Sequence, residues 1–115
     1  AYSGPCSVFR KTLGEVMGNK QMFEVAKGCA LEARKMGDIK NVNFTFDDTI
    51  KYITEFGKKL LDSKPSMLQD VEAKRLSEID AINGMVVTLG EENSIETPFN
   101  LAVSSIIKAY EEDYK

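Results

Sequence analysis

The side chains best suited to chemistry lie in the stretch PSMLQDVEAKRLSEID, residues 65–80. Two helix-start patterns fall eleven residues apart in it, one at Ser66 and one at Ser77. The chain contains no histidine, so the commonest general base and metal ligand is missing. Any acid–base chemistry must therefore use other groups, and a hydroxyl at Ser66 with a carboxylate at Glu78 is the most useful pair in this stretch.

The double start decides whether those two groups can meet. In one unbroken helix, Ser66 and Glu78 would lie about 18 Å apart along the axis and about 120° around it. We therefore expect separate helices, with a sharp change of direction between Arg75 and Ser77. The start of a helix favours anions, because its first N–H groups are free and its dipole is positive there. The pair then suits a small molecule that carries a carboxylate and a hydroxyl or keto group.

A plainer interpretation is purely structural. Ser66 and Ser77 can each cap their own helix, with about 1 kcal/mol of stabilisation per cap. Asp70 and Asp80 can complement the dipole of a first helical turn, and Asn83 beside a glycine can serve packing. The residue types alone leave the structural and the functional interpretation open.

Helical periodicity surrounds this stretch. We expect a helix over residues 19–36, with Asn19 as N-cap, Gly37 as C-terminal cap and a close helix crossing at Gly28. A box-like start at Thr45-x-x-Asp48 predicts a second helix that ends near residue 62. Its apolar positions are Ile50, Ile53, Phe56, Leu60 and Leu61.

The last predicted helix starts with Thr97 as its cap and Pro98 at its first position. It carries the clearest apolar stripe, formed by Phe99, Ala102, Val103, Ile106, Ile107 and Tyr110. No segment has the pattern of a β-sheet or a repeat. The sequence therefore predicts one all-α domain over residues 1–115, a compact bundle of five or six helices.

Composition excludes several classes of partner. The formal charge is −3, with 15 basic and 18 acidic residues well mixed, so we expect no nucleic-acid binding. No apolar run is long enough for a membrane span. Cys6 and Cys29 match neither a zinc site nor a disulfide framework, and buried free thiols indicate a reducing, cytoplasmic location.

The segment from Pro65 to Asn100 resembles the C-terminal domain of the ketopantoate reductases, which are 2-dehydropantoate 2-reductases. The family pattern runs Ser-Met-Leu-Gln-Asp, Thr-Glu-Ile-Asp, Asn-Gly and Thr-Pro-x-Asn. Matching residues here are Ser66, Met67, Leu68, Gln69, Asp70, Glu78, Ile79, Asp80, Asn83, Gly84, Thr97, Pro98 and Asn100, with Ser77 in place of Thr. The opening AYSGPCSVFRKTLGEV resembles, more loosely, the segment after the family's catalytic lysine.

This resemblance implies that residues 1–115 form the helical substrate-binding domain of a two-domain enzyme, of the 6-phosphogluconate-dehydrogenase-like type. Its partner would be its own N-terminal Rossmann domain, which binds NADPH. The family reduces 2-dehydropantoate, or a related 2-keto acid, to the 2-hydroxy acid in the pantothenate branch leading to coenzyme A. Carried over by residue, the serine that binds the substrate carboxylate falls on Ser66, and the active-site glutamate falls on Glu78.

Two departures qualify the implied function. The family's lysine is expected a few residues before Ala1, and no Gly-x-Gly-x-x-Gly is present, so this chain alone is expected to be inactive and to bind no cofactor. Family asparagines that contact the substrate are replaced at Gly4 and near Leu13, which leaves a related 2-keto acid as an alternative substrate. The alternative function is a non-catalytic helical dimerisation module, and a homodimer is compatible with either function.

Overall fold

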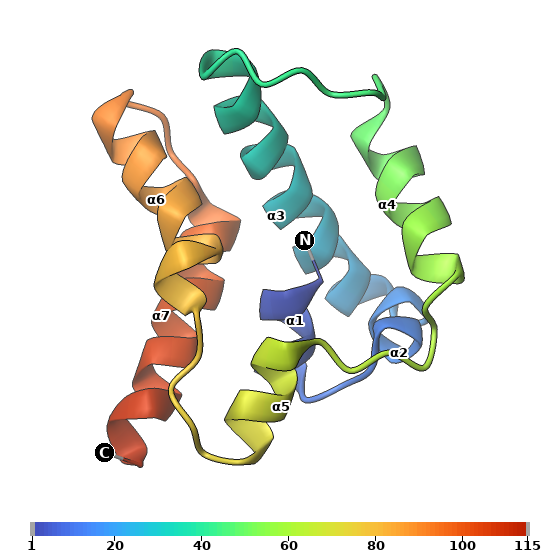
Figure 1. The fold of residues 1–115 in the computed structure, drawn as a ribbon, viewed down its shortest axis with the longest axis vertical. Coiled ribbons are helices and arrows are strands. Elements are labelled where there is room, and N and C mark those ends of the chain that lie inside the picture. Colours follow the sequence, from blue (N-terminus) through green and yellow to red (C-terminus); the bar gives the residue numbers. More distant parts are fainter. Residues whose placement is uncertain (1, 115) are drawn as a thin grey trace.

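The computed structural model describes residues 2–114 and is all-helical over that range, which confirms the predicted fold class (Figure 1). The described residues form seven α-helices and one short 3-10 helix, more elements than the expected five or six because two short helices open the chain. In order they are α1 (Ser3–Phe9), α2 (Leu13–Met17), α3 (Lys20–Ile39), α4 (Thr49–Lys58), α5 (Ser66–Glu72), η1 (Ile79–Ala81), α6 (Asn83–Glu92) and α7 (Pro98–Asp113).

The helices enclose a core with two neighbouring clusters. One joins α1 to α5 through Tyr2, Cys6, Leu13, Val16, Ala26, Ala30, Ile53 and Leu68. The other joins α3, α5, η1 and α7 through Cys29, Met67, Val71, Ile79, Val103 and Ile107. Helices α3 and α5 contribute to both clusters, so they hold the two halves of the domain together. Figure 1 shows α1 at the centre of this arrangement, with α5 below it and α6 and α7 to one side.

Side-chain caps fix where three helices begin. The Asn19 side chain accepts a hydrogen bond from the Met22 N–H at 3.0 Å, as predicted. In α4 the cap is Asp48 and not Thr45, because the Asp48 carboxylate accepts from the Lys51 N–H at 3.0 Å. A capping box that the sequence analysis overlooked starts α2, where Thr12 and Glu15 bond each other's backbone.

Helix ends were predicted less well than starts. Helix α3 continues through Gly37 to Ile39, so the predicted C-terminal cap is wrong. Helix α4 ends at Lys58, several residues before the expected boundary near 62. The close crossing at Gly28 is confirmed, because a Cβ added there would collide with the Phe99 ring of α7. This contact sets how closely α3 and α7 can approach.

Both cysteines are buried free thiols, as expected. Burial is the main cause that raises the pKa of Cys6 to about 11 and the pKa of Cys29 to about 12. Each thiol therefore stays protonated near neutral pH and packs as a small apolar side chain. Among the described residues, no helix combines the length and apolar character that a membrane crossing requires.

Candidate functional site

The segment with the double start does break, so an unbroken helix is excluded. Helix α5 begins at Ser66 and ends at Glu72, and the next helical turn, η1, begins only at Ile79. Between them the backbone of Lys74 adopts a left-handed conformation with φ 57°. That conformation turns the chain away from the axis of α5, slightly earlier than the sequence indicated.

Ser66 lies at the start of α5, but it does not cap the helix. The N-cap position belongs to Pro65, and no side chain caps the first turn. Gln69, the other half of the predicted box, donates from Nε2 to the Lys64 carbonyl at 2.9 Å instead. The structural interpretation is therefore wrong for Ser66, whose exposed hydroxyl has no hydrogen-bond partner among residues 2–114.

The second predicted box does not form either. The Ser77 N–H donates to the Glu111 carboxylate of α7 at 2.6 Å, and the Ser77 hydroxyl is buried without a partner among the described residues. Asp80 forms an ion pair with Lys108 at 2.7 Å rather than closing a box. Glu78 occupies the N-cap position of η1 without a side-chain cap. Its carboxylate is exposed, and no described residue bonds or pairs with it.

The core brings the surroundings of Ser66 and Glu78 together. Met67, next to Ser66, and Ile79, next to Glu78, are both buried in the cluster that contains Val103 of α7. The first turn of α1 packs on the same region, because a Cβ added at Gly4 would touch both Val103 and the Asn83 side chain. The two candidate residues therefore border one packed unit of α1, α5, η1 and α7.

A pocket of about 400 Å³ reaches Pro65, the residue before Ser66, although Ser66 itself is not among the residues that line it. Ser63 and Pro65 line it on the side of α5, and Tyr2 and Ser3 line it at the start of α1. Tyr52 and Phe56 of α4 line the opposite side and are 44% and 46% exposed. This pocket was not predicted from the sequence, because the spacing of Phe56 indicates an apolar helix face but not whether that face is covered.

A buried polar network lies behind the site. The Asn83 side chain donates to Asn100 Oδ1 at 2.9 Å, and Asn100 Nδ2 donates to Glu32 Oε1 at 2.8 Å. Glu32 also accepts from the backbone N–H groups of Phe99 and Asn100, each at 2.9 Å. Thr97 is the positional N-cap of α7, with Pro98 first as predicted, yet the carboxylate that caps the helix is Glu32 of α3. The Asn100 amide is thus fully used within the fold, whereas Asn83 Oδ1 is buried without a hydrogen-bond partner among the described residues.

Comparison with known proteins agrees with this geometry. Residues 1–111 match the family model described as "Ketopantoate reductase PanE/ApbA C terminal". A 2-dehydropantoate 2-reductase of Streptococcus pyogenes is 31% identical over 107 residues, which cover 92% of this chain and 35% of that protein. The chain therefore spans about a third of the length of the curated relatives that it matches.

Solved structures share the fold at low sequence identity. A PanE/ApbA family ketopantoate reductase from Ralstonia eutropha superposes with a TM-score of 0.88 at 20% identity, covering 97% of this chain and 37% of that one. D-mandelate dehydrogenase in complex with NADH and anilino(oxo)acetate gives a TM-score of 0.84 at 21% identity, with the same coverages of 97% and 37%. On the family match, this chain belongs to the ketopantoate reductase family and corresponds to its C-terminal domain.

Proposed function

We propose that this chain is the substrate-binding domain of an NADPH-dependent reductase that converts a 2-oxo acid, 2-dehydropantoate or a relative of it, to the 2-hydroxy acid. One observation carries the proposal. Ser66 and Glu78, which the resemblance to the family assigns to its site positions, border the same packed unit, and both side chains are exposed without partners among the described residues. Family membership also favours this function over a non-catalytic dimerisation module.

In this proposal the Ser66 hydroxyl donates a hydrogen bond to the substrate carboxylate. Helix α5 is only seven residues long, so its dipole is weak and the hydroxyl makes the main contact. The Glu78 carboxylate accepts a hydrogen bond from the substrate oxygen as that oxygen becomes a hydroxyl. It also orients the lysine expected before Ala1, and its negative charge favours the protonated lysine that acts as general acid.

The described residues contain no strand and no glycine-rich strand-to-helix turn, so the nucleotide would be held by the proposed N-terminal Rossmann domain. When bound, the nicotinamide supplies the hydride for the keto carbon. This chain's contribution is to hold the carboxylate at Ser66 and the reacting oxygen at Glu78. A cytoplasmic location and a homodimer stay predictions.

Steady-state kinetics of the complete protein, with 2-dehydropantoate and other 2-oxo acids, tests the proposal. Glu78→Gln keeps the size of the side chain but removes its charge, so kcat/KM should fall about 100-fold or more. Glu92→Gln is the matched control, because Glu92 is an exposed glutamate at the far end of α6. Equal activity of the two variants, or no turnover of any 2-oxo acid by the wild-type protein, would contradict the proposal.

A further inference from the structure

We infer that the preferred substrate is a 2-oxo acid with an aromatic or similarly large apolar side chain, and that Tyr52 and Phe56 of α4 bind that side chain. This inference rests on the proposed function, because it uses Ser66 to place the carboxylate end of the substrate. It assigns the pocket beside Ser66 to the other end of the same molecule.

The lining of the pocket changes character along its length. Near α5 and the start of α1 the pocket is lined by Ser3 and Ser63, whose hydroxyls have no hydrogen-bond partner among the described residues. Toward α4 its surface is formed by Tyr52, Phe56 and Leu60. Among the described residues no charged side chain lines the pocket, so none of them would compensate a second charge on the substrate. A substrate whose polar end lies near Ser66 and whose apolar end lies against α4 would match this change from a polar to an apolar lining.

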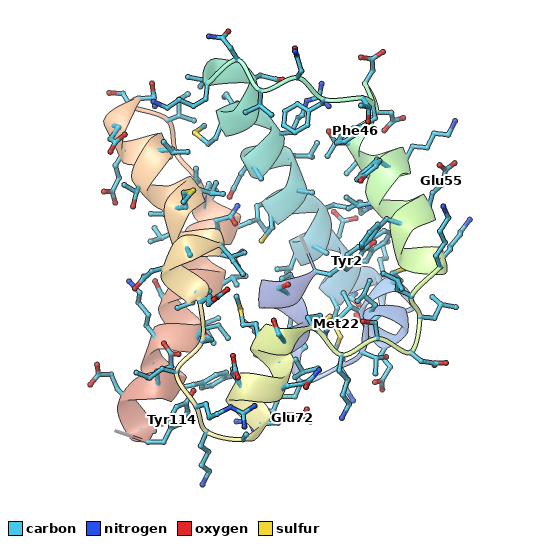
Figure 2. All side chains as sticks on the ribbon, viewed as in Figure 1. Tyr2, Met22, Phe46, Glu55, Glu72 and Tyr114 are labelled. Atoms are coloured by element: carbon cyan, nitrogen blue, oxygen red, sulfur yellow. The ribbon has the colours of Figure 1, made fainter. Side chains whose placement is uncertain are left out.

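The aromatic side of the pocket is held in place before any ligand binds. The Tyr52 ring stacks on Phe46 with centroids 3.9 Å apart and planes 9° apart, and Phe56 follows at 6.4 Å. The Arg34 guanidinium lies 5.0 Å from the centre of the Phe46 ring and donates to the Phe46 carbonyl at 2.5 Å. Figure 2 shows Phe46 at the start of α4. This stack fixes the rings, so little side-chain entropy would be lost on binding.

Hydrogen bonds also hold in place the other side of the pocket, which is formed by the start of α1, the start of α2 and the segment before α5. The Tyr2 hydroxyl donates to the Ile53 carbonyl of α4 at 2.6 Å, and Figure 2 shows Tyr2 on the inner side of that helix. The N–H groups of Leu13 and Gly14 donate to the carbonyls of Ser63 and Leu61, at 3.2 Å and 2.8 Å. These bonds tie α1, α2 and the segment before α5 around the pocket, which therefore stays open as a shaped cavity.

Exposure separates these rings from ordinary core aromatics. Tyr52 and Phe56, one turn apart on α4, are 44% and 46% exposed, and Leu60, just beyond the end of that helix, is 42% exposed. Adjacent large apolar side chains left in water lose the stabilisation that burial gives, and such groups mark binding sites. A ring stacked or packed edge-on against Tyr52 and Phe56 would recover that burial.

The test compares substrates on the complete protein that carries this chain, with phenylpyruvate and phenylglyoxylate against pyruvate and 2-dehydropantoate. We expect kcat/KM for an aromatic substrate to exceed that for pyruvate about 100-fold or more, and to exceed that for 2-dehydropantoate as well. Phe56→Ala should lower kcat/KM for the aromatic substrate about 20-fold, mainly through KM, and change it for pyruvate less than about threefold.

Glu55→Gln is the matched control, because Glu55 precedes Phe56 on α4 but points outward in Figure 2 and does not line the pocket. Tyr52→Leu preserves an apolar side chain and repeats the test if Phe56→Ala fails to fold. Two results together would overturn this inference and leave the proposed function intact. The wild-type protein would prefer 2-dehydropantoate, and the Tyr52 and Phe56 variants would keep the wild-type kcat/KM for aromatic substrates. No turnover of any 2-oxo acid would overturn both.

Discussion

The polar network of Asn83, Asn100 and Glu32 and the pair of Ser66 and Glu78 come from one domain but differ in their surroundings. Asn83 and Asn100 are 4% and 2% exposed, and their amides bond to each other and to Glu32. Ser66 and Glu78 are exposed, and none of the described residues bonds their side chains. Four of these five residues belong to the family motif, yet only Ser66 and Glu78 combine an exposed side chain with the absence of a partner among the described residues; Asn83 Oδ1 also lacks a partner there, but it is buried.

This difference indicates that some residues of the motif stabilise the fold, while others keep hydrogen-bonding groups that a ligand could use. A buried amide finds most of its partners within the protein, because each group left unbonded costs about 1–3 kcal/mol, and in this network Asn83 Oδ1 alone lacks a partner among the described residues. An exposed hydroxyl or carboxylate at the edge of a packed core has no such need and keeps its hydrogen-bonding capacity for a substrate. Substitutions in the network should therefore change stability, and those at Ser66 and Glu78 should change function.

The largest effect on stability is expected for Asn100→Ala. The change removes the acceptor of the buried Asn83 amide, the side-chain donor to the Cys29 carbonyl and one of the donors to the half-buried Glu32. We expect the free energy of unfolding to fall by about 3 kcal/mol. Urea denaturation measures it, with Asn93→Ala as a control on a less buried asparagine that bonds within its own helix end. A loss below about 1 kcal/mol would mean that the network is not structural.

A smaller loss is expected for Gly4→Ala. The new Cβ would lie 2.5 Å from Val103 Cγ1 and 2.7 Å from Asn83 Oδ1, so α1 would have to move away from α6 and α7. Such overpacking should lower the free energy of unfolding by about 2 kcal/mol. Combining the change with Val103→Ala should recover part of the loss if the contact is the cause, and strictly additive losses would contradict that explanation.

Alkaline pH should weaken the buried region through Cys29, whose carbonyl accepts from Asn100. Burial raises the pKa of the folded Cys29 thiol from 9.0 to about 12, so the folded state keeps a proton that the unfolded chain releases. This stabilisation is complete below pH 9 and is lost as the pH rises toward 12. In that window Cys29→Ala should reduce the pH slope of the unfolding free energy by about 1.4 kcal/mol per pH unit. If urea denaturation gives the same pH slope of the unfolding free energy for the wild-type protein and the Cys29→Ala variant, this role is refuted.

Local signals predicted much of the fold and the identity of the candidate site residues. Asn19 and Pro98 marked their helix starts, and the periodicity of residues 19–36 and 98–110 indicated the two longest helices. Long-range partners could not be read from the chain. The Ser77 box fails because its N–H is taken by Glu111, 34 residues away, and α7 is capped by Glu32, 67 residues from Phe99.

Periodicity alone also could not predict which apolar side chains of α4 and the residues after it are buried. The spacing of Ile53, Phe56 and Leu60 predicts one helix face, yet only Ile53 is buried and Leu60 lies beyond the end of α4. Which part of an apolar face is covered depends on where other segments end, and here α1 reaches Ile53 through Tyr2 but leaves the outer rings open. The pocket therefore needed the structure, whereas Ser66 and Glu78 were proposed as site residues from the motif alone.

The smallest expected effect on stability tests the central claim most directly. Ser66→Ala should leave the urea unfolding free energy of the chain unchanged within about 0.5 kcal/mol, because the hydroxyl does not cap α5. Thr12→Ala, which removes a genuine cap, should cost about 1 kcal/mol in the same assay. In the complete protein, Ser66→Ala should raise KM for the 2-oxo acid by about 10-fold or more, as expected for a lost bond to a charged group. A Ser66 variant that is destabilised like the Thr12 variant, with wild-type KM, would contradict the assignment of Ser66 to the site.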